Sequence, residues 1–341
     1  MAGTIKVALI GTGYWGPNFL RVASETESVE MKWCCDLDEQ KLKRIKARSP
    51  AINTTINYKE ILDDSEVDAI ILATPAKTHY KIAKDCLEKG KNILVEKPMT
   101  YSSAECEELI KIAEKQKKVL MVGHTFEYNT AVQKLKSLIE TGEVGEPYYL
   151  YSTRVNLGRI QEDINAMWSL APHDVSMLIY LMGKMPETVI AVGEAYVQKD
   201  IEDVVFMTLK FPKKVIAQVH VSWLDPTKIR KLTLVGSEKM AVFDDVDNEA
   251  KLKIYDKGVS KINLNNVYGQ YMLKLRAGEI SIPNIPMTEP LKNEFDDFIS
   301  CIRTNRKPIS DGNSGLRVIR VLEAAQKSLK GGNVEVAIKQ E

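Results

Sequence analysis

Apolar and polar residues follow two alternating patterns over residues 1–123. Short, nearly continuous apolar runs, typical of strands buried on both faces of a parallel sheet, alternate with segments whose apolar residues recur every three or four positions, as in helices. The strand-like runs are 5–10, 29–35, 67–73, 92–95 and 119–123. The helical segments between them include 39–48, 77–89 and 102–116. This alternation predicts an α/β domain with a doubly wound parallel sheet over 1–123.

The pattern changes after His124. An amphipathic helix is expected over 131–141 and another over about 172–182, but most segments between 147 and 264 alternate residue by residue, as strands do. The glycine- and proline-rich stretch 265–290 reads as a long loop, and two helices, at about 290–303 and 312–329, follow it. We therefore expect a second domain over 124–341, of the α+β class, with a largely antiparallel open sheet.

The first apolar run leads into a glycine-rich turn, Gly11-x-Gly13-x-x-Gly16, and then into a helical segment. Gly11 permits a tight turn, Gly13 lets the backbone approach a pyrophosphate, and Gly16 lets the helix and strand pack closely. The second run ends in Asp36, about 20 residues after the last glycine, where a carboxylate accepts ribose hydroxyls and repels a 2′-phosphate. This arrangement predicts a Rossmann domain that binds NAD rather than NADP, with Tyr14 and Trp15 beside the pyrophosphate.

Two further strands end in residues suited to a ligand crevice. Thr74-Pro75 follows one run and Glu96-Lys97-Pro98 follows the next, and the carboxyl ends of parallel strands form the crevice beside the glycine turn. We expect Thr74, Pro75 and Glu96 to contact the cofactor. Lys97 is unusual directly after a buried strand, since lysine is rarely buried unless paired.

These segments together resemble the Gfo/Idh/MocA oxidoreductase family over essentially the whole chain. The segments that carry the resemblance are the glycine turn, Glu96-Lys97-Pro98, Gly123-His124-Thr125-Phe126, Arg154-x-Asn156-Leu157-Gly158, and Trp168-Ser169-Leu170-Ala171-Pro172-His173-Asp174. The resemblance is nearest to the branch that acts on nucleotide-linked sugars, in particular the UDP-N-acetylglucosamine 3-dehydrogenases. It implies a substrate wall and an oligomer contact on the second sheet.

The resemblance assigns Lys97 as the catalytic lysine and His173 as the acid/base histidine. Family members often carry aspartate four residues before this histidine, where the present chain has Ser169, which cannot serve as a carboxylate base. The sequence leaves open whether Lys97 or His173 is the base. The remaining residues expected at the site are His79 near the cofactor and, as substrate contacts besides Lys97 and His173, Tyr128, Arg154, Asn156, Trp168 and Ser169.

The implied activity is oxidation of a secondary hydroxyl, at C3, of a nucleotide-linked sugar such as UDP-N-acetylglucosamine. Three alternatives stay open: a 3-ketosugar reductase or an inositol or free-sugar dehydrogenase, an NAD-dependent glycosidase of the same family, and a non-catalytic NAD-binding protein. The presence of both Lys97 and His173 argues against the last of these. Retention of the cofactor without net NADH formation would distinguish the glycosidase.

The composition limits the classes of partner that we expect this chain to bind. The formal net charge is +1 and basic residues are interspersed with acidic ones, so we expect neither nucleic acid nor a membrane surface as a partner. No run is apolar for the ~20 residues a membrane helix needs, no signal peptide is recognised, and no metal-ligand spacing is found. We expect a cytoplasmic homodimer or homotetramer without a metal. The five cysteines, which form no C-x-x-C motif, are expected to be small core residues: Cys34, Cys35, Cys86, Cys106 and Cys301.

Overall fold

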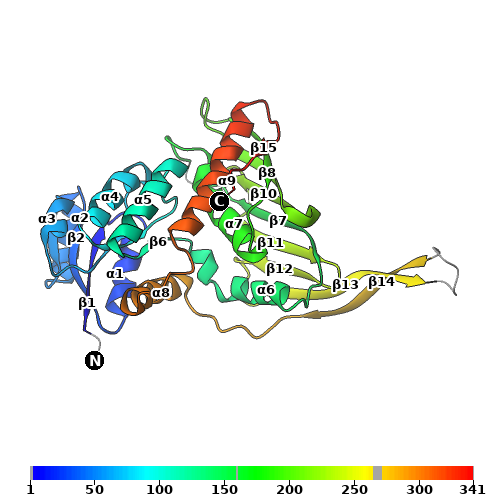
Figure 1. Ribbon diagram of the computed structural model, residues 1–341, viewed down its shortest axis with the longest axis horizontal. Coiled ribbons are helices and arrows are strands. Elements are labelled where there is room, and N and C mark those ends of the chain that lie inside the picture. The colour runs from blue at the N-terminus through cyan, green and yellow to red at the C-terminus, as the bar shows by residue number, and fades with distance from the viewer. Residues whose placement is uncertain (1–2, 159, 264–270, 341) are drawn as a thin grey trace. The chain divides into compact units, whose positions relative to one another are not determined.

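The computed structural model describes residues 3–158, 160–263 and 271–340, and these form two compact units (Figure 1). The first unit contains residues 1–128 and 288–320, and the second contains 129–287 and 321–341. The sequence places one boundary after residue 123 and everything beyond it in the second domain. The structure instead returns 288–320 to the first unit.

The first unit contains a six-stranded parallel sheet with the strand order β3-β2-β1-β4-β5-β6. The sheet confirms the predicted doubly wound fold. Its strands are β1 (Ile5–Ile10), β2 (Val29–Cys35), β3 (Asn53–Thr55), β4 (Ala69–Leu72), β5 (Asn92–Val95) and β6 (Leu120–Val122). The connecting helices are α1 (Gly16–Ser24), α2 (Glu39–Arg48), α3 (Tyr58–Asp63), η1 (Ala76–Thr78), α4 (His79–Glu88), α5 (Ser103–Gln116) and η2 (Thr125–Tyr128).

A helix from late in the chain, α8 (Pro290–Thr304), completes the core of the first unit. Phe295 and Phe298 of this helix are fully buried in the same apolar cluster as Phe19 and Val22 of α1. Burying a side chain of this size contributes about 1.5–3 kcal/mol, so α8 supplies a substantial part of the core. This packing explains why the chain returns to the first unit.

The second unit contains a nine-stranded sheet with the order β14-β13-β12-β11-β7-β10-β9-β8-β15. All its neighbours are antiparallel except β7 and β10, which confirms the largely antiparallel sheet that the alternation predicts. The strands are β7 (Pro147–Val155), β8 (Thr188–Glu194), β9 (Val204–Lys210), β10 (Ile216–Ser222), β11 (Ile229–Gly236), β12 (Met240–Asp244), β13 (Leu252–Asn263), β14 (Tyr271–Ser281) and β15 (Val336–Ala337). The helices of this unit are α6 (Thr130–Glu140), α7 (Ala166–Met182) and η3 (Pro212–Lys214), while α9 (Gly312–Lys330) begins in the first unit and ends in the second.

Helix α7 begins six residues earlier than the sequence predicts. The prediction placed Pro172 in the first turn, where proline is favoured, but Pro172 lies inside the helix. The start is set by Asn165, whose side-chain oxygen accepts a hydrogen bond from the backbone N–H of Trp168 at 3.1 Å. An asparagine cap of this kind satisfies one of the free N–H groups at a helix start.

The prediction of a loop over 265–290 is wrong for residues 271–281, which form strand β14 paired antiparallel with β13. Glycine and proline guided the prediction, yet Gly278 is accommodated near a shift in the strand register and the prolines follow the strand. The hairpin of β13 and β14 extends as a long arm from the sheet (Figure 1). Residues 264–270 lie outside the described residues.

The five cysteines are all buried and none forms a disulfide, which confirms their prediction as core residues. Burial raises the pKa of Cys34 to about 12 and that of Cys35 to about 11, so neither is a reactive thiolate at neutral pH. Across the described ranges, the structure contains no helix with the length and apolar character that a bilayer crossing needs.

Candidate functional site

The glycine turn after β1 is shaped as the sequence predicts. Gly11 has a φ of +95°, and a Cβ at this position would lie 2.5 Å from the carbonyl oxygen of Ala73. A Cβ on Gly16 would lie 2.7 Å from the carbonyl oxygen of Gly11, so both positions need glycine. A Cβ on Gly13 would meet nothing within 4 Å. The open space at Gly13 is where a pyrophosphate would approach the backbone.

The start of α1 offers backbone N–H groups to an anion. No side chain caps this helix, and Pro17 occupies its first turn. Such an end carries a partial positive charge and favours phosphate groups. Tyr14 is 87% exposed and its ring meets that of Trp15 edge-on at 5.8 Å, so these two aromatic residues are not core anchors.

Asp36, at the end of β2, is held by the glycine turn itself. Its Oδ2 accepts hydrogen bonds from the backbone N–H of Thr12 at 2.8 Å and from the Thr12 hydroxyl at 2.6 Å. Its Oδ1 accepts from the N–H of Asp38 at 2.9 Å. Burial would raise the pKa of Asp36, but these hydrogen bonds outweigh burial and lower it. Asp36 is therefore a fixed carboxylate with lone pairs still available to sugar hydroxyls.

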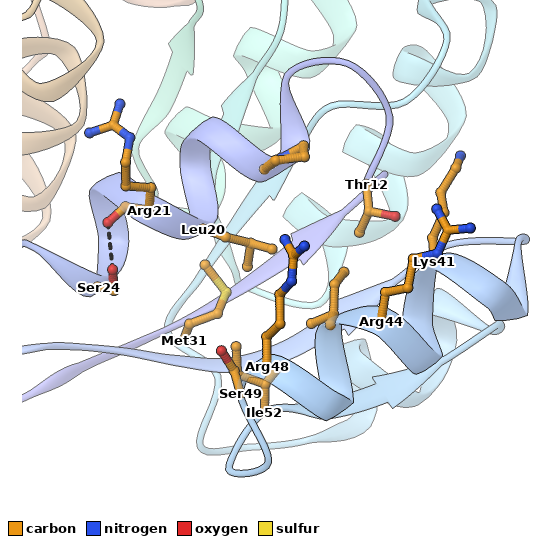
Figure 2. A pocket seen from close by; sticks show the side chains of 12 residues that line it. Thr12, Leu20, Arg21, Ser24, Met31, Lys41, Arg44, Arg48, Ser49 and Ile52 are labelled. Atoms are coloured by element: carbon orange, nitrogen blue, oxygen red, sulfur yellow. Dashed lines mark hydrogen bonds between the residues drawn. The ribbon is translucent and has the colours of Figure 1, made fainter.

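A groove of about 600 Å³ between α1 and α2 begins beside this carboxylate (Figure 2). Thr12 and Lys41 both line it, and Lys41 Nζ lies 3.7 Å from Asp36 Oδ1. Arg44 and Arg48 line the groove on the next turns of α2, and across the residues that the structure describes neither has an ion-pair partner. The apolar floor includes Leu20, Met31 and Ile52. Positive charge thus lies next to the predicted ribose site.

The ends of β4 and β5 bring the other predicted cofactor residues together. Thr74 and Pro75 follow β4, while Glu96 and Lys97 follow β5, and these strands are neighbours in the sheet. His79, at the start of α4, lies 1% exposed between the two segments. These positions lie outside the carboxyl ends of the strands, where ligands bind in doubly wound sheets.

Glu96 is buried directly before Lys97. Its Oε2 accepts a hydrogen bond from the Lys97 backbone N–H at 3.2 Å. Burial raises the pKa of Glu96 to about 7, although the positive charge of Lys97 opposes the shift. A second acid lies nearby that the sequence does not predict, Glu294 of α8, which is fully buried and accepts a hydrogen bond from the Thr125 hydroxyl at 3.2 Å. Burial, followed by the charge of Glu96, raises the pKa of Glu294 well above its usual range.

In the second unit, α7 leaves one small part of its surface open. Along 166–179 all residues are buried except three that are partly exposed: Ser169, Leu170 and His173. Ser169 and His173 are four residues apart in a continuous helix, so they share one face. The early start of α7 therefore places these two predicted site residues side by side on its accessible surface.

The residue after His173 is tied to the sheet. Asp174 is 1% exposed, and its two carboxylate oxygens accept hydrogen bonds from Arg154 Nε at 2.6 Å and from the Ser152 hydroxyl at 2.5 Å. Arg154 and Ser152 belong to β7, so this buried network fixes α7 against the sheet. The sequence predicted Arg154 as a substrate contact, whereas the structure places its guanidinium beside Asp174 with 4% exposure.

Three other predicted substrate residues differ in their exposure. Tyr128 is 2% exposed in the first unit, and its hydroxyl donates a hydrogen bond to Asp297 at 2.8 Å. Trp168 is largely buried and donates from Nε1 to Gln326 at 3.0 Å. Asn156 is half-buried just after β7, and a Cβ on Gly158 would lie 2.7 Å from its side-chain nitrogen. Of these three, Asn156 has the accessible polar group.

No group of three or more histidine, cysteine, aspartate or glutamate residues within the described ranges could hold a metal ion. The predicted cofactor residues gather at the strand ends of the first unit. The accessible predicted substrate residues gather around α7 and the end of β7 in the second unit.

Two family models match the chain. The model described as "Oxidoreductase family, NAD-binding Rossmann fold" of Gfo/Idh/MocA matches residues 5–124, and that of the "GFO/IDH/MocA C-terminal domain" matches 132–242. A UDP-N-acetylglucosamine 3-dehydrogenase of Acidithiobacillus ferrooxidans is 27% identical over 257 residues, covering 75% of this chain and 76% of the relative. A myo-inositol 2-dehydrogenase of Thermotoga maritima is 21% identical over 96% of each chain. The crystal structure of GenD2 from gentamicin A biosynthesis in complex with NAD superposes with a TM-score of 0.84, at 22% identity, over 100% of this chain and 98% of GenD2.

Proposed function

Since the chain belongs to the Gfo/Idh/MocA family of NAD-binding oxidoreductases, we propose that it oxidises the C3 hydroxyl of a nucleotide-linked sugar, UDP-N-acetylglucosamine, to the 3-keto form. The observation that carries the proposal is the accessible Ser169 and His173 pair on α7, held next to the buried Arg154–Asp174 ion pair. The name of the Acidithiobacillus relative supports the choice of substrate.

The residues of the first unit fit NAD. Gly11, Gly13 and the uncapped start of α1 would hold the pyrophosphate, and the Asp36 carboxylate would accept hydroxyls of the adenosine ribose. Tyr14 and Trp15, both exposed beside this turn, would pack against the cofactor. When bound, the nicotinamide supplies the acceptor for the hydride.

Oxidation of a secondary alcohol also requires a base for the hydroxyl proton. In the proposed mechanism the imidazole of His173 takes this proton, since histidine titrates near neutral pH. The ammonium group of Lys97 can donate a hydrogen bond to a substrate oxygen and stabilise negative charge that develops on it. Ser169 and Asn156 contact sugar hydroxyls, while Arg154 and Trp168 support these residues through their buried contacts. Tyr128 supports the first unit through its hydrogen bond to Asp297.

A second candidate is oxidation of an inositol. The similarity to the Thermotoga myo-inositol 2-dehydrogenase, which extends over 96% of this chain, favours it as the alternative. The fold alone does not choose between these substrates. The absence of a carboxylate at position 169, where the chain has Ser169, does not favour one substrate over the other, because both reactions need the same proton transfer.

We also propose that the protein is a cytoplasmic homodimer or homotetramer. On the face of the second sheet opposite α7, apolar side chains remain 42% to 47% exposed: Tyr149, Tyr151, Val192, Phe206 and Ile216. Ile216 pairs with Tyr149, and Phe206 pairs with Val192, so apolar side chains are exposed on each of four neighbouring strands. Exposed apolar surface on a sheet face is usually covered by another chain.

The test is NADH absorbance after mixing the protein with NAD and one of five substrates: UDP-N-acetylglucosamine, UDP-N-acetylgalactosamine, UDP-glucose, a dTDP-sugar or myo-inositol. A coupling aminotransferase or a carbonyl trap removes the keto product and prevents reversal of the oxidation. NADH formation with UDP-N-acetylglucosamine supports the proposal. Activity confined to myo-inositol overturns the proposed substrate and favours the second candidate.

A further inference from the structure

His79 makes two polar contacts that join separate segments of the first unit. Its Nδ1 lies 2.8 Å from the carbonyl oxygen of Pro98, and its Nε2 lies 2.9 Å from the carbonyl oxygen of Thr74. The ring is 1% exposed, so water does not compete for either contact. Both ring nitrogens are therefore directed at backbone carbonyls inside the protein.

The two carbonyls belong to the segments that leave adjacent strands. Thr74 follows β4, while Pro98 follows Lys97 after β5. A carbonyl oxygen only accepts hydrogen bonds, so the imidazole must be the donor in whichever contact is a hydrogen bond. A neutral ring has one N–H group and donates to one carbonyl at a time, whereas a doubly protonated ring donates to both. The side chain thus links the segment carrying Lys97 to the other edge of the crevice.

We propose that His79 is a positioning residue that fixes Lys97 through the carbonyl of Pro98. The significance for catalysis rests on the proposed function, in which Lys97 contacts the substrate oxygen. The link itself is a property of the first unit. A lysine that must meet a reacting oxygen depends on such support, because a displacement of about 1 Å can cost roughly 100-fold in rate.

The chain offers a matched control. Thr78 supports the same Thr74–Pro75 segment, since its hydroxyl lies 2.7 Å from the Thr74 hydroxyl and 2.7 Å from the Pro75 carbonyl oxygen. It makes no hydrogen bond to Pro98 among the contacts of the described residues. Thr78→Ala therefore loosens one edge of the crevice and leaves the link to Lys97 in place.

The experiment observes Lys97 directly. Lysines are labelled by reductive methylation with ¹³C-formaldehyde, and the Lys97 resonance is assigned by its loss in Lys97→Arg. His79→Leu removes both ring nitrogens, and we expect it to shift the Lys97 resonance and its titration midpoint. His79→Asn places an amide nitrogen near the position of Nδ1, so it should restore the wild-type resonance. The control Thr78→Ala should leave the Lys97 resonance unchanged. His79→Gln places its amide nitrogen near Nε2, toward Thr74, and should not restore it.

An unchanged Lys97 resonance in His79→Leu would overturn the proposal, as would restoration by Gln but not by Asn. If His79→Leu does not fold, the Asn and Gln variants decide the question between them. Turnover is a separate measurement, in which His79→Leu should lower kcat roughly 100-fold with a much smaller change in KM. If none of the five substrates is oxidised, the proposed function fails while the resonance still tests the role of His79.

Discussion

The Nε atom of Arg154 lies 2.6 Å from Oδ2 of Asp174, and both side chains are almost completely buried in the second unit. This ion pair joins β7 to α7 at the residue next to His173. It was not evident from the sequence, which predicts Arg154 as a substrate contact. The buried carboxylate explains the arginine, because a charge without a partner in this environment would be costly.

Asp174→Asn should destabilise the protein by about 3–5 kcal/mol, because it leaves the Arg154 charge buried without its partner. The free energy of unfolding, measured in urea, checks this expectation. Asp244→Asn is the matched control. It disrupts a more exposed pair on the same sheet, Lys231–Asp244 at 3.0 Å, and should cost less than about 1 kcal/mol. An equal decrease in the free energy of unfolding in the two variants would contradict the expectation that burial makes the Arg154–Asp174 pair more important.

Lys97→Ala and His173→Ala should each lower kcat by roughly 10²–10⁴-fold, because each removes a group that handles the hydroxyl proton or the charge on its oxygen. The affinity for NAD, followed by quenching of tryptophan fluorescence, should change little. Lys89→Ala, which removes an exposed lysine paired with Asp63, should retain wild-type turnover. Wild-type turnover in Lys97→Ala or His173→Ala would remove that residue from the mechanism.

Ser169→Asp should raise the pKa of His173, because it places a carboxylate one helical turn before the imidazole. A histidine acting as a base must be neutral, so the rise of kcat/KM on the acidic side of its pH profile should move to higher pH. Ser169→Asn, which has a similar shape without the charge, should keep the wild-type profile. A shift in Ser169→Asn as large as in Ser169→Asp would point to shape rather than charge.

Asp36→Ser should weaken NAD binding and improve NADP binding. The substitution removes the carboxylate that would repel a 2′-phosphate, and it releases Lys41, which lies 3.7 Å away beside Arg44 in the groove of Figure 2. Calorimetric titration with both dinucleotides measures the change. Asp38→Ser removes the other carboxylate near Lys41, and the serine can still cap α2. The preference of this variant for NAD over NADP should therefore stay close to that of the wild type.

Glu96→Gln should flatten the dependence of stability on pH. The pKa of Glu96 is about 7 in the folded chain and near 4.5 when unfolded, so between these values the folded state holds a proton that the unfolded state has lost. Its contribution to stability therefore decreases by about 1.4 kcal/mol for each unit of rising pH in this window. Urea unfolding at pH 5 and pH 7 should show a smaller decrease for Glu96→Gln than for the wild type or the exposed control Glu27→Gln.

The elements predicted well from the sequence are those whose determinants are local. Asn92–Val95 is a short apolar run with Gly90 before it and Glu96 after it, and the strand has these bounds. The glycine turn and Asp36 are likewise defined by spacing. The start of α7 was missed because Asn165 and Pro172 both resemble a helix start, and only the hydrogen bond to Trp168 decides between them.

The features that the sequence could not supply depend on distant parts of the chain. An amphipathic helix does not reveal which core it covers, so the return of α8 to the first unit was not foreseen. The environments of Arg154 and Glu294 depend on Asp174 and on the surroundings of Thr125, at separations of 20 and 169 residues. The open face of α7 also emerges only when the helix packs against its sheet.

The return of residues 288–320 also affects how the chain is made. While it is synthesised from the N-terminus, Phe19 and Val22 emerge early, but the phenylalanines of α8 that cover them appear only after residues 129–287, most of the second unit. The nucleotide-binding unit therefore cannot reach its final core on the ribosome before residues 129–287 have been translated. Its apolar surface remains exposed for that interval, which makes the nascent chain a candidate client for molecular chaperones.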